Sequence, residues 1–205
     1  MKDPRFAKAV VFVNAALPLA IITLDWWNGR LGANPLEFFT NATGLLTLTF
    51  LTLSLAITPV RKLTGWNFLS HFRRMLGLYA FFYGLLHLLA FAWFDHFFDP
   101  RAIAADVVKR PFVTFGMLGF FLMVPLAVTS TNAAVKRMGA KRWKMLHRLA
   151  YAAAVAGVVH YWLKVKVVTT LPLTFAVIDT VLLLYRVVQA LRPRSRKRTP
   201  AARAA

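Results

Sequence analysis

The chain has 205 residues, of which 59% are hydrophobic and 14% aromatic, and its mean hydropathy of +0.57 excludes an ordinary soluble domain. It contains no cysteine, which excludes disulfides, iron–sulfur clusters and thiolate metal sites. The net charge of +19 would suit a nucleic-acid-binding protein, but the distribution of the basic residues argues against that partner.

Six apolar segments are each long enough to cross a hydrocarbon core of about 30 Å, which takes about 20 residues. In chain order they are 8–27, 40–59, 75–94, 112–130, 146–163 and 168–190. The first could be mistaken for a signal peptide, but it has no clear small-residue cleavage site and continues into Trp26 and Trp27, which is typical of a membrane interface. We therefore predict an all-α, polytopic membrane bundle of six transmembrane helices.

The connections between these segments are short, so we expect no inserted soluble domain. In the fourth connection, Thr131 and the two residues before it offer capping oxygens, residues 132–138 are expected to form a short helix, and Gly139 is expected to end it. We expect residues 1–191 to form one transmembrane domain. Residues 192–205, rich in proline, arginine and alanine, are expected to form a basic, disordered cytoplasmic tail.

Lysine and arginine are distributed unevenly between the two sides of the predicted bundle. Most of the 26 basic residues lie in the N-terminus, the second and fourth connections and the tail, which would share one side. Five of the seven acidic residues lie in the connections on the other side. The positive-inside rule then places both termini in the cytoplasm. Because the basic charge follows topology, anionic lipid headgroups and not nucleic acid are its expected partner.

Three histidines at membrane depth carry the strongest functional signal. His87 lies in the third span, and His147 and His160 lie in the fifth. An imidazole in hydrocarbon is costly unless it faces protein and has a partner, and neutral imidazole is a common axial ligand of haem iron. Both spans run outward from the cytoplasm, so His87 and His160 lie at similar depth. We predict that they hold one haem between them; the alternative is that each is a hydrogen-bonded core histidine.

A second level lies near the cytoplasmic boundary. His87 follows Arg73 by 14 residues and His160 follows His147 by 13, which corresponds to about 20 Å of helix in each case. Fourteen residues along an ideal helix return to within about 40° of the same face, so Arg73 and His87 lie on one face of their span. Thirteen residues leave an angle of about 140° between His147 and His160, so a shared face there requires local tightening or a kink, for example near Gly157. Arg73 stays protonated, so it either pairs with a haem propionate or leaves an inner iron with one protein ligand. His147 is either that ligand or an ordinary interfacial histidine. Whether a second haem binds at this level stays open.

Other polar residues suggest weaker functional signals. His71 and His96 lie in connections and are expected to be solvated. Asp179, near the middle of the sixth span, either belongs to a proton or quinone path or pairs with a neighbouring helix. Hydroxyl side chains of the second span are expected to supply interhelical packing and hydrogen bonds. These are Thr43, Thr47, Thr49, Thr52 and Ser54.

Three stretches of the chain carry a family resemblance. They are RRMLGLYAFFYGLLHLL at 73–89, KRPFVTFG at 109–116 and TSTNAAVKRMGAKRWKMLHRLAYAAAVAGVVHYWLKVK at 129–166. Together they resemble the MsrQ family, the haem-binding membrane subunit of the bacterial periplasmic protein-methionine-sulfoxide reductase system, within the ferric-reductase-like transmembrane group. By position, His87, His147 and His160 match the family's haem-associated histidines. Arg73 stands where the wider group has a fourth histidine.

The resemblance implies a haem b protein of the bacterial inner membrane that passes electrons to a periplasmic molybdopterin-containing catalytic subunit, which repairs oxidised methionines of envelope proteins. The implied donors are the quinone pool or a cytosolic flavin reductase, and FMN is a further implied cofactor. The chain is then an electron-transfer subunit and not the catalytic one. Two alternatives stay open: a stand-alone haem-containing metal or quinone reductase, and a small transporter without a cofactor.

Overall fold

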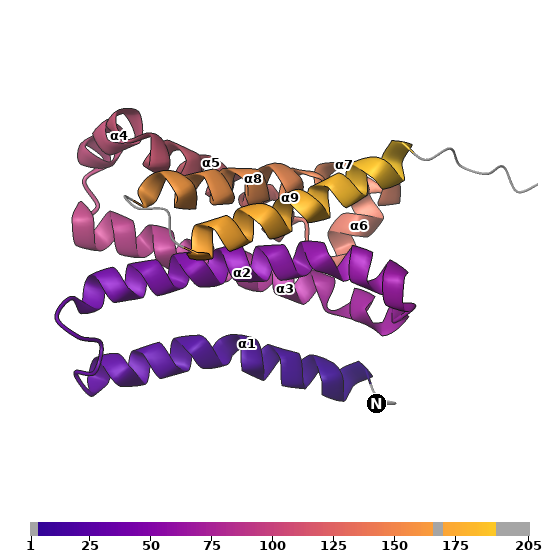
Figure 1. Ribbon diagram of the computed structural model, residues 1–205, viewed down its shortest axis with the longest axis horizontal. Coiled ribbons are helices and arrows are strands. Elements are labelled where there is room, and N and C mark those ends of the chain that lie inside the picture. Colours follow the sequence, from indigo (N-terminus) through magenta and orange to yellow (C-terminus); the bar gives the residue numbers. More distant parts are fainter. Residues whose placement is uncertain (1–3, 166–169, 192–205) are drawn as a thin grey trace, which may run out of the picture.

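A computed structural model describes residues 4–165 and 170–191, and within them every regular element is helical (Figure 1). The elements are α1 (Pro4–Trp27), α2 (Pro35–Thr64), η1 (Asn67–His71), α3 (Arg73–Ala90), η2 (Phe91–Asp95), α4 (Pro100–Lys109), α5 (Pro111–Val128), α6 (Asn132–Met138), α7 (Ala140–Leu146), α8 (Leu149–Lys164) and α9 (Thr170–Leu191). The all-α class is therefore confirmed. The predicted tail at 192–205 lies outside the described residues.

Five of the described helices are long and apolar enough to cross a membrane, namely α1, α2, α3 with its η2 extension, α5 and α9. They correspond to five of the six predicted spans, so the chain is a multi-pass membrane protein. The span predicted over 146–163 corresponds to α8, which has 16 residues and begins three residues later than expected. At 1.5 Å per residue, α8 is about 24 Å long, somewhat shorter than the hydrocarbon core.

The ends of the helices follow local capping chemistry. Asn34 caps α2 by accepting a backbone hydrogen bond from its first turn, and Gly65 ends that helix at a φ of 76°, a left-handed conformation that suits glycine. In the fourth connection the side chain of Thr131 accepts a hydrogen bond from the first turn of α6, which spans Asn132–Met138, and Gly139 follows it. The short helix predicted there is confirmed, with both of its ends.

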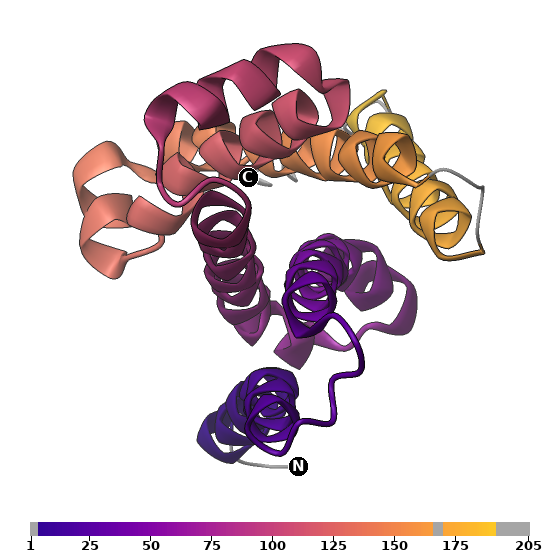
Figure 2. The ribbon, with the colours of Figure 1, turned by 90° about the vertical axis from the view of Figure 1, so that its left-hand side faces the viewer.

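The centre of the bundle is made of two helix pairs. Helix α2 packs against α3, α5 packs against α8, and the pairs meet through contacts between α3 and α5 and between α2 and α8. Helix α9 lies beside α2 and α8, and α1 lies outside α3 (Figures 1 and 2). The described chain begins and ends at the end of the bundle that carries α6 and α7, away from α4 (Figure 1).

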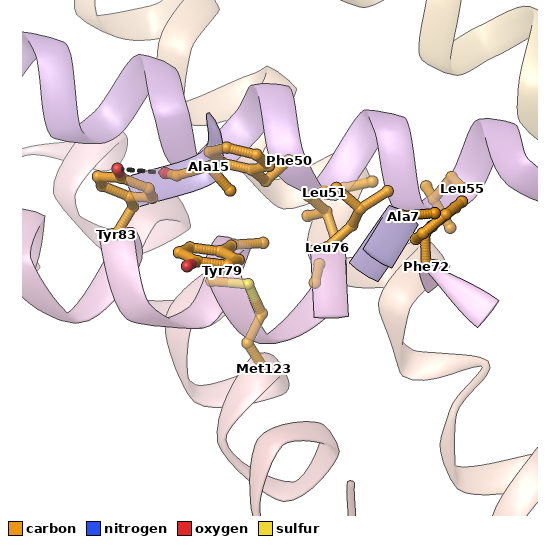
Figure 3. Close-up of a cluster of buried hydrophobic side chains, with 13 residues drawn as sticks. Ala7, Ala15, Phe50, Leu51, Leu55, Phe72, Leu76, Tyr79, Tyr83 and Met123 are labelled. Carbon is orange, nitrogen blue, oxygen red and sulfur yellow. Dashed lines mark hydrogen bonds between the residues drawn. The ribbon is translucent and has the colours of Figure 1, made fainter. Parts of the chain in front are cut away.

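An aromatic cluster joins α1 to α2 and α3 (Figure 3). The rings of Phe50 and Tyr83 are stacked with centroids 5.5 Å apart, and Tyr83 is fully buried. Its hydroxyl donates a hydrogen bond of 2.7 Å to the carbonyl of Ala15, and the hydroxyl of Tyr79 donates one of 2.9 Å to the carbonyl of Phe12. Two tyrosine hydroxyls of α3 thus hold the backbone of α1 against the bundle.

Candidate functional site

The structure brings the imidazoles of His87 and His160 together between α3 and α8. Their ring centroids are 5.9 Å apart and their planes are inclined by 82°. At the opposite end of the bundle, Arg73, the first residue of α3, and His147, in the turn before α8, line a common pocket. The two helices therefore run in the same direction, and the histidines lie at matched depth, as the sequence predicted.

Each of the two rings is oriented by a backbone carbonyl. Nδ1 of His87 lies 2.8 Å from the carbonyl oxygen of Thr40 in α2, and Nδ1 of His160 lies 2.6 Å from that of Phe112 in α5. A carbonyl only accepts hydrogen bonds, so each Nδ1 carries the proton and each Nε2 keeps its lone pair. This is the usual arrangement of a metal-ligating histidine, in which the second nitrogen is fixed by an outer partner.

Two glycines let these rings lie directly against a neighbouring backbone. A Cβ atom at Gly44 in α2 would lie 3.0 Å from the ring of His87, and one at Gly116 in α5 would lie 2.7 Å from Nδ1 of His160. Each imidazole is therefore held between a carbonyl and a glycine. Neither glycine was predicted from the sequence, although a glycine within an apolar helical segment often marks close packing.

The ring pair fits the axial positions of a haem iron. Metal–imidazole bonds are about 2 Å long, so two axial imidazoles on one iron have centroids about 6 Å apart, close to the observed separation of 5.9 Å. Within the described residues no group of three or more histidine, cysteine, aspartate or glutamate side chains could hold a metal ion. Two imidazoles suit an iron whose remaining ligands come from a macrocycle.

The inner level differs in chemistry from the outer one. Arg73, Arg74, Trp143 and His147 line a pocket between α2, α3, α5 and the turn that precedes α8. Nε2 of His147 lies 3.1 Å from the hydroxyl oxygen of Thr129, and the indole of Trp143 stacks on its ring at 3.8 Å. Burial lowers the pKa of His147, and the charges of the two arginines lower this pKa further. Among the described residues that line this pocket, His147 is the only histidine.

The backbone around His147 explains why the ideal-helix angle between His147 and His160 does not apply. His147 lies outside α8, in the turn between α7 and α8. The amide of Arg148 bonds to the carbonyl of Met145, so the chain tightens to three-residue hydrogen bonding there. The tightening that the sequence required therefore occurs at this turn, and not near Gly157, which lies within the uninterrupted α8.

The expectation for the two connection histidines is half right. His71 is exposed, as predicted. His96 is not solvated: only 12% of its side chain is exposed, and its Nε2 lies 3.1 Å from a carboxylate oxygen of Asp106. Asp106 also pairs with Arg110 at 3.3 Å. The prediction for His96 was wrong because α4 returns over the end of η2 and carries this acid to it.

Asp179 is paired with a neighbouring helix, which was one of its two predicted roles. The side chain is 2% exposed, and one carboxylate oxygen accepts a 3.1 Å hydrogen bond from Thr52 of α2. Ser54 donates to a backbone carbonyl of α3, which is a second interhelical bond. The remaining hydroxyls bond to carbonyls of their own helix, so the prediction of interhelical hydrogen bonds is wrong for them. These are Thr43, Thr47 and Thr49. Interhelical packing is confirmed for Thr47, whose methyl group lies against Gly84 of α3.

Five long apolar helices define a multi-pass helical membrane protein, and two of its helices, α3 and α8, bring a pair of imidazoles together. Residues 42–158 match the family model described as ferric reductase like transmembrane component. A relative from Herminiimonas arsenicoxydans is 52% identical over 92% of this chain and 88% of its own length. One from Rhodospirillum rubrum is 51% identical over 98% of this chain and 97% of its own. Both are named protein-methionine-sulfoxide reductase heme-binding subunit MsrQ. The chain belongs to the MsrQ family.

Proposed function

We propose that this chain is the electron-transfer subunit of a protein-methionine-sulfoxide reductase and that His87 and His160 are the axial ligands of one haem b. The observation that carries the proposal is the ring pair, with centroids 5.9 Å apart and both Nδ1 atoms bonded to carbonyls. The relatives' name, which includes haem binding, supports the same cofactor. In this role the chain delivers electrons and does not itself reduce methionine sulfoxide.

The residues of the site favour electron transfer over substrate chemistry. A bound haem supplies one-electron redox chemistry. His87 and His160 would both hold the haem iron, one from α3 and one from α8, and an iron held in this way would serve electron transfer and not substrate binding. The carbonyls of Thr40 and Phe112 hold the two rings in orientation and raise their basicity as ligands. The protein therefore sets the redox potential mainly through these ligands, their carbonyl partners and burial.

The proposed topology has six crossings of the bacterial inner membrane, with α8 as the fifth and both termini in the cytoplasm. Basic residues at the end of the bundle formed by α6 and α7 support this orientation; they are Lys136, Arg137, Lys141, Arg142 and Lys144. The opposite end carries acidic residues; these are Glu37, Asp95, Asp99 and Asp106. Residues 1–191 form the transmembrane domain in this proposal, and 192–205 form a cytoplasmic tail.

Electrons enter at the inner level in this proposal, from quinol or from a cytosolic flavin reductase. The pocket with Arg73, Arg74 and His147 suits a cofactor that carries a phosphate or carboxylate, because guanidinium groups bind both. FMN and a second haem both meet that requirement. Electrons leave at the α4 end to a periplasmic molybdopterin-containing catalytic subunit.

The haem ligands are tested by reduced-minus-oxidised spectra of membranes that contain the protein. We expect His87→Ala and His160→Ala each to abolish the same b-type spectral component. His71→Ala, which changes an exposed histidine outside the bundle, is the matched control and should leave the spectrum intact. Unchanged spectra in both core variants would contradict the pairing.

The role as a subunit is tested by mixing the dithionite-reduced protein, freed of reductant, with a purified periplasmic molybdopterin-containing sulfoxide reductase. We expect the haem to be oxidised only when both the periplasmic reductase and a methionine-sulfoxide substrate are present. Fast oxidation by ferric chelates or quinone, with none through the periplasmic protein, would instead show a stand-alone reductase.

A further inference from the structure

We propose that Lys164 and Asn41 together bind a propionate carboxylate of the haem; this inference rests on the proposed function. Lys164 is the last residue of α8 and follows His160 by four positions. Residues four apart lie on the same helix face, one turn from each other. The ammonium group of Lys164 therefore extends from the ring pair toward the α4 end of the bundle.

Asn41 occupies the corresponding position on α2. It precedes Gly44, whose backbone contacts the ring of His87, by three residues, so it lies one turn further toward the same end of the bundle. It also directly follows Thr40, whose carbonyl orients that ring. Nζ of Lys164 donates a hydrogen bond to Oδ1 of Asn41. The two side chains thus join α2 to α8 immediately beyond the paired histidines.

The donors at this position suit a carboxylate. An ammonium group has three N–H donors, and the bond to Asn41 uses one of them. The amide nitrogen of Asn41 adds two more donors. Lys164 is the last residue of α8 and Asn41 lies within the first two turns of α2, so an acid held there lies near the α4 end of the bundle and avoids the cost of a carboxylate buried in hydrocarbon. Charge-assisted bonds of this type are stronger than bonds between neutral groups.

The charge of Lys164 is available for such a ligand. Glu37 and Asp95 lie within electrostatic range of its ammonium group, but neither forms an ion pair with it in the described part of the chain. Lys164 lies one helical turn beyond His160 on the same face of α8. It is therefore near enough to the ring pair to influence a cofactor held there.

The first test compares three substitutions in the haem-loaded, full-length protein. Lys164→Met should lower the haem midpoint potential, because removal of a nearby cation favours the ferric state, and should speed haem transfer to apomyoglobin about tenfold. Lys164→Arg should keep both properties near wild type. Lys109→Met, at an exposed position of α4, is the matched control and should change neither. An unchanged Lys164→Met protein would overturn the proposal.

The second test separates propionate binding from a purely structural link between α2 and α8. Apoprotein is reconstituted with haem or with haem dimethyl ester, whose propionates carry no charge. We expect Lys164→Met to speed loss of haem but not of the diester relative to wild type. An equal effect on both would assign Lys164 a structural role and overturn the proposal. If the wild-type protein takes up neither cofactor, or the histidine variants keep the full spectrum, it is the proposed function that fails.

Discussion

Substitution of Gly116 by alanine tests the contact that orients His160. The added Cβ would lie 2.7 Å from Nδ1 of His160 and 3.0 Å from Cε1. The ring must retreat by about 0.7 Å to reach ordinary van der Waals separation. That movement weakens the 2.6 Å hydrogen bond to the carbonyl of Phe112, at a cost of about 1 kcal/mol. Loss of such an outer partner typically lowers metal affinity about 10–100-fold.

Haem content per protein by pyridine haemochrome, together with the rate of haem transfer to apomyoglobin, measures this loss. Gly77→Ala in α3 is the matched control, because its Cβ would meet nothing closer than the Ser54 hydroxyl oxygen at 3.6 Å. Both substitutions gain about 1 kcal/mol of helix propensity, so a difference between them isolates the contact with His160. We expect Gly116→Ala to lose haem at least tenfold faster than Gly77→Ala. Equal retention would refute this reasoning.

Further predictions concern the contacts that hold the outer helices. Thr52→Val removes the hydrogen bond to Asp179 and should lower the free energy of unfolding in detergent by about 1–3 kcal/mol. The double variant with Asp179→Leu should recover most of this loss, because no buried carboxylate is then left without a partner. A Thr52→Val protein as stable as wild type would contradict this prediction. Tyr83→Phe removes the bond to Ala15 and should speed hydrogen exchange in α1, at a cost of about 1 kcal/mol. Unchanged exchange in α1 would show that this bond does not hold the helix.

The parts of the fold that follow from local chemistry could be predicted. Thr131 and Gly139 define both ends of α6 because a capping oxygen and a glycine at a φ of 77° act within one turn. The matched depth of His87 and His160 required only their positions in two co-directional spans and the rise of a helix. The sequence therefore indicated which side chains meet in the bundle.

The contacts that orient the site could not be predicted, because they join distant parts of the chain. Gly44 precedes His87 by 43 residues, and the carbonyl of Phe112 lies 48 residues before His160. Which glycine faces which ring depends on helix rotation, and a small rotation moves a contact to another face. The helix break beside His147 was missed for a related reason: the apolar pattern continues through it, and only the backbone hydrogen bonds reveal the tighter turn.

Electron paramagnetic resonance of the oxidised, purified protein tests most directly whether His87 and His160 share one iron. Their ring planes are inclined by 82°, and nearly perpendicular axial imidazoles give a strongly anisotropic low-spin ferric signal. We predict that signal in the wild-type protein and its disappearance in both His87→Ala and His160→Ala. Survival of this strongly anisotropic signal in either variant, or its absence from the wild-type protein, would contradict the shared axial ligation.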